Sequence, residues 1–269
     1  YELPRWVERL DGRCLGYSNL DSITFNDDRF ARALDKLYHT HRACLMTRLV
    51  VAMIETFDVE LSRVHNDSTT VKAFGQIPGQ TRSGLHLRHG HSKDHRPDLK
   101  QLVFNLSISA DGAVPIHHQV YAGNRSDNTT HIETWTALHA LHARADFIYV
   151  GDSKLCTDQQ LHYIVTHGGR VITTVPETWS EVRQFKATLR LGKKTKRVIW
   201  RRQKPGGSED EQEYFSCFLG QYFTDKRGYR LHWLYSSTKR QRDRDERHER
   251  LTKAERELSE LNAKLNQRR

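Results

Sequence analysis

The sequence predicts an α/β fold built around a mixed β-sheet. Between residues 58 and 176, short apolar runs typical of buried strands alternate with helical segments. Two of these runs lead into an Asp-Ser pair, at Asp67 and at Asp152. A helical region precedes this core, and a basic segment and a charged helix follow it. We therefore expect four parts: a helical N-terminal region (1–57), the α/β core (58–176), a β-rich basic insertion (177–237) and a charged helix (238–269).

The composition is that of a globular protein. The chain has 269 residues, of which 36% are hydrophobic and 28% charged, which argues against a disordered chain. No run reaches the roughly 18 apolar residues of a membrane helix, and no signal-peptide pattern is present. The four cysteines are scattered without a Cys-x-x-Cys pair, so a reduced, cytoplasmic protein is expected.

Two helices are expected in the N-terminal region. Residues 26–28 (Asn-Asp-Asp) supply an N-cap, and apolar residues then recur at spacings of three and four over 30–38. A second apolar-periodic stretch covers 43–57. This region fits either core packing or a small DNA-binding subdomain, and core packing is the simpler interpretation.

Three strands are expected at the start of the core, over 59–71, 102–109 and 113–121. Asp111-Gly112 separates the second from the third and is a strong hairpin signal, so these two strands should be antiparallel neighbours. The rest of the core follows as a helix (128–143), a strand (147–150) ending at Asp152, a helix (158–167) stopped by Gly168-Gly169, and a strand (171–175) stopped by Pro176. The order is β-β-β-α-β-α-β.

The last two parts differ in pattern. Residues 177–237 carry few helical signals, and strands are expected over 198–202, 214–219 and 229–235. From Leu251 to Leu265, apolar residues fall at alternating spacings of three and four, which is a heptad seam on a strongly charged helix. That seam fits a partner helix or, more simply, packing within a further domain.

The charge of the chain favours a polyanionic partner. The net charge is +10, and the stretch Arg183–Lys204 alone holds ten Lys and Arg residues with no Asp or Glu. Such a cluster is typical of phosphate contacts on nucleic acid. The alternative is a solvated strand pair whose lysines protect a sheet edge.

Asp67 and Asp152 are the candidate catalytic residues. We read each as a strand-end carboxylate, and two such carboxylates on neighbouring strands can share Mg²⁺ (or Mn²⁺), the apparatus for cutting and joining phosphodiesters. Each Asp alone fits a turn residue or a helix N-cap equally well. Their separation, 152 − 67 = 85 residues, leaves room for a hairpin and a helix. This arrangement is that of the ribonuclease H-like fold, in which adjacent central strands carry both acids.

Four segments carry a family resemblance. They are the twelve-residue block Gly90-His-Ser-Lys-Asp-His-Arg-Pro-Asp-Leu-Lys-Gln101, together with Asn-Asp-Asp-Arg-Phe-Ala-Arg-Ala-Leu-Asp at 26–35, Asp67-Ser-Thr-Thr and Gly151-Asp-Ser-Lys. Through them the chain resembles the DDE transposases of bacterial insertion sequences, in the insertion-sequence-four-like superfamily, from about residue 20 to its end. The twelve-residue block is highly specific, whereas Asp-Ser pairs alone are not.

The resemblance implies a function and its partners. Asp67 and Asp152 become the first two acids of a catalytic triad, with a β insertion before the third. The partners become the terminal inverted repeats of an element and its target DNA, bound by a homodimer in the DNA complex, with no membrane. The expected chemistry is in-line attack on phosphorus by water and then by a 3′-hydroxyl.

Basic residues are the candidate DNA contacts. Arg88, Lys93 and Arg96 lie in or beside the twelve-residue block, and Lys154 follows Asp152 by two residues. Asn124 and Arg125 are weaker candidates. His86, His89, His91 and His95 crowd the same basic loop, where phosphate contact is favoured over a zinc site and a solvated polar loop is the plain alternative. The full set is Lys154, Arg88, Lys93, Arg96, Arg190, Lys193, Lys194, Lys196, Arg197, Arg201 and Arg202.

The third acid is not found. Its signature in the resembling superfamily, Tyr-x-x-Arg-x-x-x-Glu, has no match in the sequence. Glu246, Glu249, Glu255 and Glu257 fit a solvated helix face instead. We therefore expect a chain truncated before the third acid and inactive alone. The alternatives are a ribonuclease H-like nuclease without strand transfer and an inactive DNA-binding remnant.

Overall fold

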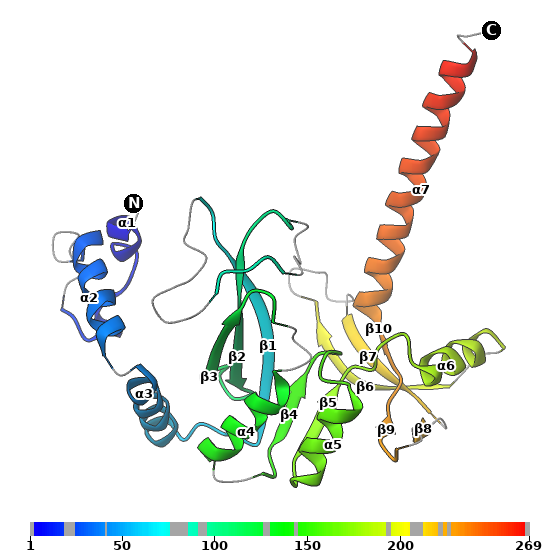
Figure 1. Cartoon of the computed structure of the whole chain (residues 1–269). Helices are drawn as coiled ribbons and strands as arrows, with labels where there is room; N and C mark the ends of the chain where they lie inside the picture. Colours follow the sequence, from blue (N-terminus) through cyan, green and yellow to red (C-terminus); the bar gives the residue numbers. More distant parts are fainter. Residues whose placement is uncertain are drawn as a thin grey trace. The chain divides into compact units, whose positions relative to one another are not determined.

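The computed structural model (Figure 1) describes residues 3–18, 25–40, 42–75, 86–90, 96–125, 130–142, 145–191, 195–204, 212–219, 223–224 and 227–266. The chain divides into two compact units, Tyr1–Thr174 and Val175–Arg269. No helix within the described ranges has the length and apolar character that crossing a membrane requires.

Helices form the N-terminal part of the first unit. They are α1 (Leu3–Val7), the 3-10 turn η1 (Gly12–Leu15), α2 (Asp27–His39) and α3 (Arg42–Phe57). The predicted N-cap is confirmed, because the Asn26 side chain accepts a hydrogen bond of 3.0 Å from the Arg29 N–H. Core packing is confirmed for α3, which contributes Val50 to the main hydrophobic cluster.

A five-stranded mixed sheet is the centre of the first unit. Its strands are β1 (Arg63–Lys72), β2 (Gln101–Ser109), β3 (Pro115–Ala122), β4 (Ile148–Gly151) and β5 (Arg170–Thr173), in the spatial order β3-β2-β1-β4-β5. The first three strands are antiparallel neighbours, whereas β4 runs parallel to β1 and β5 parallel to β4. With β1 at the centre and the chain order β-β-β-α-β-α-β, the sheet is ribonuclease H-like, as the sequence predicts.

Two helices pack against this sheet, α4 (His131–His142) before β4 and α5 (Asp158–Thr166) after it. Alternate residues of β2 from Gln101 to Ser109 are buried and those between them are half-buried, which is the period of a strand packed mainly on one face. Gly168, with φ +85°, ends α5 as predicted. The shared core holds Val64, Ile116, Trp135, Leu138, Phe147, Tyr149, Leu155 and Ile164.

The second unit combines one short helix, two small sheets and one long helix. The helix α6 (Ser180–Arg190) precedes a three-stranded antiparallel sheet of order β10-β7-β6, built from β6 (Lys196–Gln203), β7 (Gln212–Phe218) and β10 (Leu234–Ser236). Strands β8 (Phe223–Thr224) and β9 (Arg230–Leu231) pair separately. The predicted β-rich character of this segment is therefore present.

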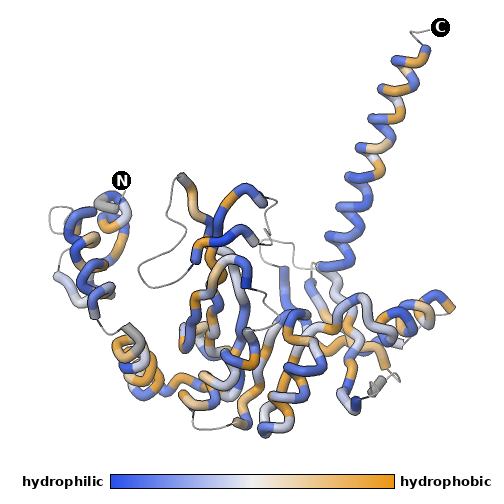
Figure 2. Tube along the Cα trace, in the orientation of Figure 1, coloured by the Kyte–Doolittle hydropathy of each residue, from blue (hydrophilic) through white to orange (hydrophobic). Residues whose placement is uncertain are grey.

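The long helix α7 (Ser237–Asn266) has no buried residue. Figure 2 shows its first half as almost continuously hydrophilic, with apolar positions spaced along the second half. The predicted seam lies in that second half, and its leucines from Leu251 to Leu265 are 56–62% exposed. Ion pairs at i,i+4 spacing, such as Arg250 with Glu246 at 3.7 Å, run along the surface of the helix.

Three elements depart from the sequence prediction. Strand β1 begins at Arg63 rather than 59, because its ladder with β2 runs from Val64 to Lys72 through residues that are polar in sequence. Asp67 is therefore in mid-strand and not at a strand end. Helix α6 was not predicted, since only Val182, Phe185 and Leu189 give it an apolar stripe; the first two are buried. The single strand expected over 229–235 is divided into β9 and β10.

Candidate catalytic site and nucleic-acid interface

Asp67 lies on the side of β1 that faces away from the core. Along this strand Val64 and Asn66 are buried, whereas His65 and Asp67 are exposed, as the two-residue period of a strand requires. Asp67 pairs with Leu106 of β2. The Ser68 N–H donates a hydrogen bond of 2.8 Å to Asp67 Oδ1.

Strands β1 and β4, which lead to the two acids, are parallel neighbours. Strands β1 and β4 pair in parallel with Arg63 opposite Ile148 and His65 opposite Val150, an offset of 85 residues (148 − 63). The same offset, continued by two residues, relates Asp67 to Asp152, which directly follows the last residue of β4. Neighbouring strands lie about 4.8 Å apart. The pairing itself ends at His65 and Val150, so each acid lies two residues beyond the last paired position of its chain segment.

Hydrogen bonds and close packing fix the backbone at Asp152. The Lys154 N–H donates to Asp152 Oδ1 at 2.9 Å, and the Leu155 N–H donates to the Asp152 carbonyl at 3.2 Å. The Thr173 hydroxyl of β5 donates to that same carbonyl. Gly151 leaves room for the turn, because a Cβ there would lie 2.9 Å from Leu155 Cδ2. Sequence reasoning did not identify Thr173, whose role depends on the β4–β5 pairing.

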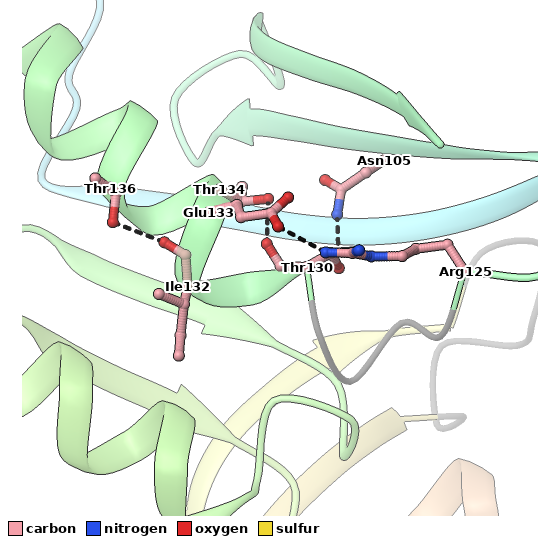
Figure 3. A network of polar contacts seen from close by, with 7 residues as sticks. All are labelled: Asn105, Arg125, Thr130, Ile132, Glu133, Thr134 and Thr136. Carbon is pink, nitrogen blue, oxygen red and sulfur yellow. Dashed lines mark hydrogen bonds and ion pairs between the residues drawn. The ribbon is translucent and has the colours of Figure 1, made fainter. Parts of the chain in front are cut away.

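A buried polar network lies behind Asp67. Asn66 Nδ2 donates to Asn105 Oδ1 at 2.5 Å, to the Leu106 carbonyl at 3.1 Å and to Ser107 Oγ at 2.9 Å. Asn105 Nδ2 in turn donates to Thr130 Oγ1 at 3.5 Å, which connects β2 to the start of α4 (Figure 3). These bonds join β1, β2 and α4 directly beneath the strand segment that carries Asp67.

The two carboxylates suit a hard divalent cation. Both residues are exposed, and within the described part of the chain neither forms an ion pair that would compete with a metal. Carboxylate oxygens are the ligands that Mg²⁺ and Mn²⁺ prefer. The described residues contain no group of three or more His, Cys, Asp or Glu side chains that could hold a metal ion. That the two acids share an ion is therefore a proposal.

The first and last residues of the twelve-residue block, Gly90 and Gln101, lie close together beside Gly123. Arg88 pairs with Gln101 as an isolated antiparallel bridge, and Gln101 Nε2 donates to the Gly123 carbonyl at 3.0 Å. Gly90 packs so closely here that a Cβ would lie 2.0 Å from the Gly123 carbonyl oxygen and 2.6 Å from Gln101 Nε2. Gly90 therefore lies against the start of β2 and the end of β3.

The described candidate DNA contacts of the first unit are exposed, but they differ in their hydrogen-bond partners. Arg96 makes two hydrogen bonds to Asp98, at 2.8 and 2.7 Å, and these bonds lower the pKa of the Asp98 carboxyl to about 2. His89 Nδ1 lies 3.1 Å from the Pro97 carbonyl. Arg88 and Lys154 are exposed. The predicted Lys93, His91 and His95 lie outside the described residues.

Arg125 is bound to α4 (Figure 3). Its guanidinium lies 2.6 Å from Glu133 Oε1 and stands over the Tyr121 ring at 5.6 Å. Partial burial raises the pKa of Tyr121 to about 12, with the Glu133 charge acting in the same direction. Arg125 therefore has two partners near α4, and its contact with DNA stays a prediction.

The basic stretch Arg183–Lys204 spans two different elements of the second unit. Arg190 lies on α6, and every residue of the edge strand β6 is exposed. Lys193 and Lys194 lie outside the described residues. On β6 Arg202 pairs with Glu213 at 2.7 Å and stands over Trp200, whereas Lys196 stands over Tyr235. The remaining candidates on this strand are Arg197 and Arg201. An exposed basic edge strand fits contact with DNA phosphates, and it fits equally well a charged sheet edge that prevents pairing with another chain.

Comparisons with known proteins give distant structural matches. No family model and no curated protein sequence matches the chain. Among solved structures, a cryo-EM structure of the piggyBac transposase synaptic complex with hairpin DNA matches over 73% of this chain and 40% of that chain, with 10% identity and a TM-score of 0.38. The Mos1 transposase paired-end complex with the left transposon end matches over 54% of this chain and 46% of that chain, with 10% identity and a TM-score of 0.27. A Mos1 mariner paired-end complex with Mn gives the same coverage and TM-score at 11% identity. The chain thus spans less than half the length of these structures.

Proposed function

We propose that this chain carries the catalytic core of a DNA transposase, in which Asp67 and Asp152 hold a divalent metal ion for strand cleavage and transfer. The observation that supports the proposal is the parallel pairing of β1 with β4, which ends at His65 opposite Val150, two residues before each acid. The sequence resemblance to DDE transposases supports the same two residues.

The chain's own residues would bind and orient the reacting groups. The two carboxylates hold the metal, and the strands beneath them fix their spacing. The backbone bonds from Ser68 and Lys154 hold one oxygen of each carboxylate in place. When bound, Mg²⁺ or Mn²⁺ activates the attacking oxygen and stabilises the leaving 3′-oxygen. Exposed cations such as Lys154 are suited to contact the phosphates on either side of the scissile bond.

The first test measures metal binding rather than turnover. Mn²⁺ is titrated against the chain and followed by electron paramagnetic resonance. Asp67→Asn and Asp152→Asn should each weaken binding by at least about tenfold, ~1.4 kcal/mol, because each removes one of two anionic ligands. Asp58→Asn is the matched control: Asp58 is exposed, and its φ of +48° suits Asn. Equal Mn²⁺ affinity of the unmodified chain and the three variants would show that neither acid binds the metal, and would overturn the proposal.

A second test separates transposition from its alternatives. The chain is incubated with paired terminal repeats, a target plasmid and Mg²⁺ or Mn²⁺. Joined products support a transposase, and nicked ends without joining support a nuclease of the same fold. A shifted gel without cleavage supports an inactive DNA-binding chain, which is the result expected while the third acid is absent. Any cleavage must disappear in Asp67→Asn while DNA binding is retained.

A further inference from the structure

A basic cavity lies where β10 runs into α7. It has a volume of about 460 Å³, and the residues that line it come from β10 and the first three turns of the helix. Four of them are cations and only Asp243 is an anion, so the lining has a surplus of three positive charges (4 − 1). The cations are Lys239, Arg240, Arg244 and Arg247. The cavity lies entirely within the second unit.

Three arginines of this cavity share one helix face. Arg240, Arg244 and Arg247 are spaced i, i+4 and i+7, which aligns their side chains along α7. Lys239 is paired with Asp243 at 3.5 Å. Within the described residues neither Arg244 nor Arg247 forms an ion pair. Two guanidinium groups are therefore available to a ligand.

Tyr235 connects this cavity to the basic edge strand. Its hydroxyl accepts a hydrogen bond of 3.1 Å from Arg240, and this bond lowers the pKa of the Tyr235 hydroxyl. The ammonium group of Lys196 on β6 stands 3.7 Å from the centre of the same ring. One half-buried tyrosine thus holds a cation from β6 and a cation from α7 side by side.

We propose that this cavity, together with Lys196, binds the phosphate backbone of DNA. The row from Arg240 to Arg247 is about 10 Å long at 1.5 Å per helical residue, which matches about three nucleotides at 3.4 Å along a strand. A single small anion needs one or two cations, whereas this row presents positive charge along a line. The positive end of the helix dipole at Ser237 adds to the same potential. The site rests on the proposed function and extends it, because the DNA contacts inferred from sequence did not include α7.

The test compares two pairs of neutralised arginines on the same helix. R244Q/R247Q removes the cations that line the cavity, and R242Q/R256Q removes two exposed arginines that do not line it. Duplex DNA binding is measured by fluorescence anisotropy over a salt series, with circular dichroism to check that α7 is retained. The slope of log affinity against log salt should fall by about 1.8 in R244Q/R247Q, which is about 0.9 per lost phosphate contact. It should not change in R242Q/R256Q.

Three outcomes would overturn the assignment. Equal slopes in the two double variants would show that the cavity has no special role, and would leave the catalytic proposal intact. An absence of salt-dependent binding in the unmodified chain would overturn this site and the proposed function together. Micromolar binding of inorganic pyrophosphate that R244Q/R247Q abolishes, with an unchanged DNA slope, would assign the cavity to a free polyphosphate instead.

Discussion

At the scale of single residues, Gly151 decides whether Asp152 can occupy its turn. The backbone hydrogen bonds to Asp152 require the chain to pass close to Leu155, whose side chain is fully buried. A Cβ at position 151 would lie 2.9 Å from Leu155 Cδ2 and 3.2 Å from Leu155 Cβ. The glycine of the Gly-Asp-Ser-Lys segment is therefore required by packing and not by a left-handed backbone.

We expect Gly151→Ala to destabilise the protein by about 1–3 kcal/mol, the usual cost of forcing an atom into a packed core. Urea unfolding measures this cost. Leu155→Ala removes Cδ2, the nearer of the two Leu155 atoms, so in the double variant the two costs should be less than additive. Strictly additive costs would mean that Gly151 and Leu155 do not interact. Mn²⁺ affinity should fall in Gly151→Ala, since the turn that holds Asp152 shifts.

At the scale of elements, the register of β1 against β2 determines which face Asp67 occupies. A slip of one residue would turn Asp67 toward the core and Asn66 toward solvent. The buried hydrogen bonds of Asn66 to Asn105 and Ser107 oppose that slip, because they form only when Asn66 faces the core. The polar residues of this strand thus specify orientation where apolar residues alone would not.

We expect Asn66→Ala to cost about 1–3 kcal/mol of stability, since it leaves the buried Asn105 amide without one of its partners. Thr69→Ala, on the exposed face of the same strand, should stay within about 0.5 kcal/mol. Denaturation measures both values. Mn²⁺ binding reports on the register, and it should weaken in Asn66→Ala but not in Thr69→Ala. Equal stability of the two variants would contradict the role given to the asparagine network.

At the scale of the whole molecule, the apolar pattern of the sequence predicted the elements of the core sheet. It did not predict contacts between residues that are far apart in the sequence. The strands and helices between 102 and 173 follow from apolar periodicity and from turn residues such as Asp111-Gly112. Their observed ends lie within a few residues of the predicted ends. The strand expected over 59–71 already contained Asp67, and only the interpretation of Asp67 as a strand-end residue was wrong, because β1 continues to Lys72. Helix α6 has too few apolar residues to be recognised from its sequence. The cavity beside α7 brings Lys196 next to Tyr235 and Arg240, from which it is about 40 residues distant in sequence.

A third carboxylate for the candidate site is not found on α7. The glutamates that the sequence offers on α7 are exposed, and two of them form ion pairs with cations of the same helix, Glu246 with Arg250 and Glu257 with Lys253. The sequence also lacks the Tyr-x-x-Arg-x-x-x-Glu signature. Two carboxylates can hold one metal ion weakly, but a second ion would lack an anchoring ligand.

We therefore expect the 269-residue chain by itself to bind Mn²⁺ and duplex DNA but not to perform strand transfer at a normal rate. The measurement is product formation with paired terminal repeats and a target plasmid, alongside the metal titration. Efficient joining by this chain would contradict the expectation. It would then direct Glu→Gln substitution to Glu246, Glu249, Glu255 and Glu257 in turn, because a catalytic glutamate abolishes joining when neutralised and a solvated one does not.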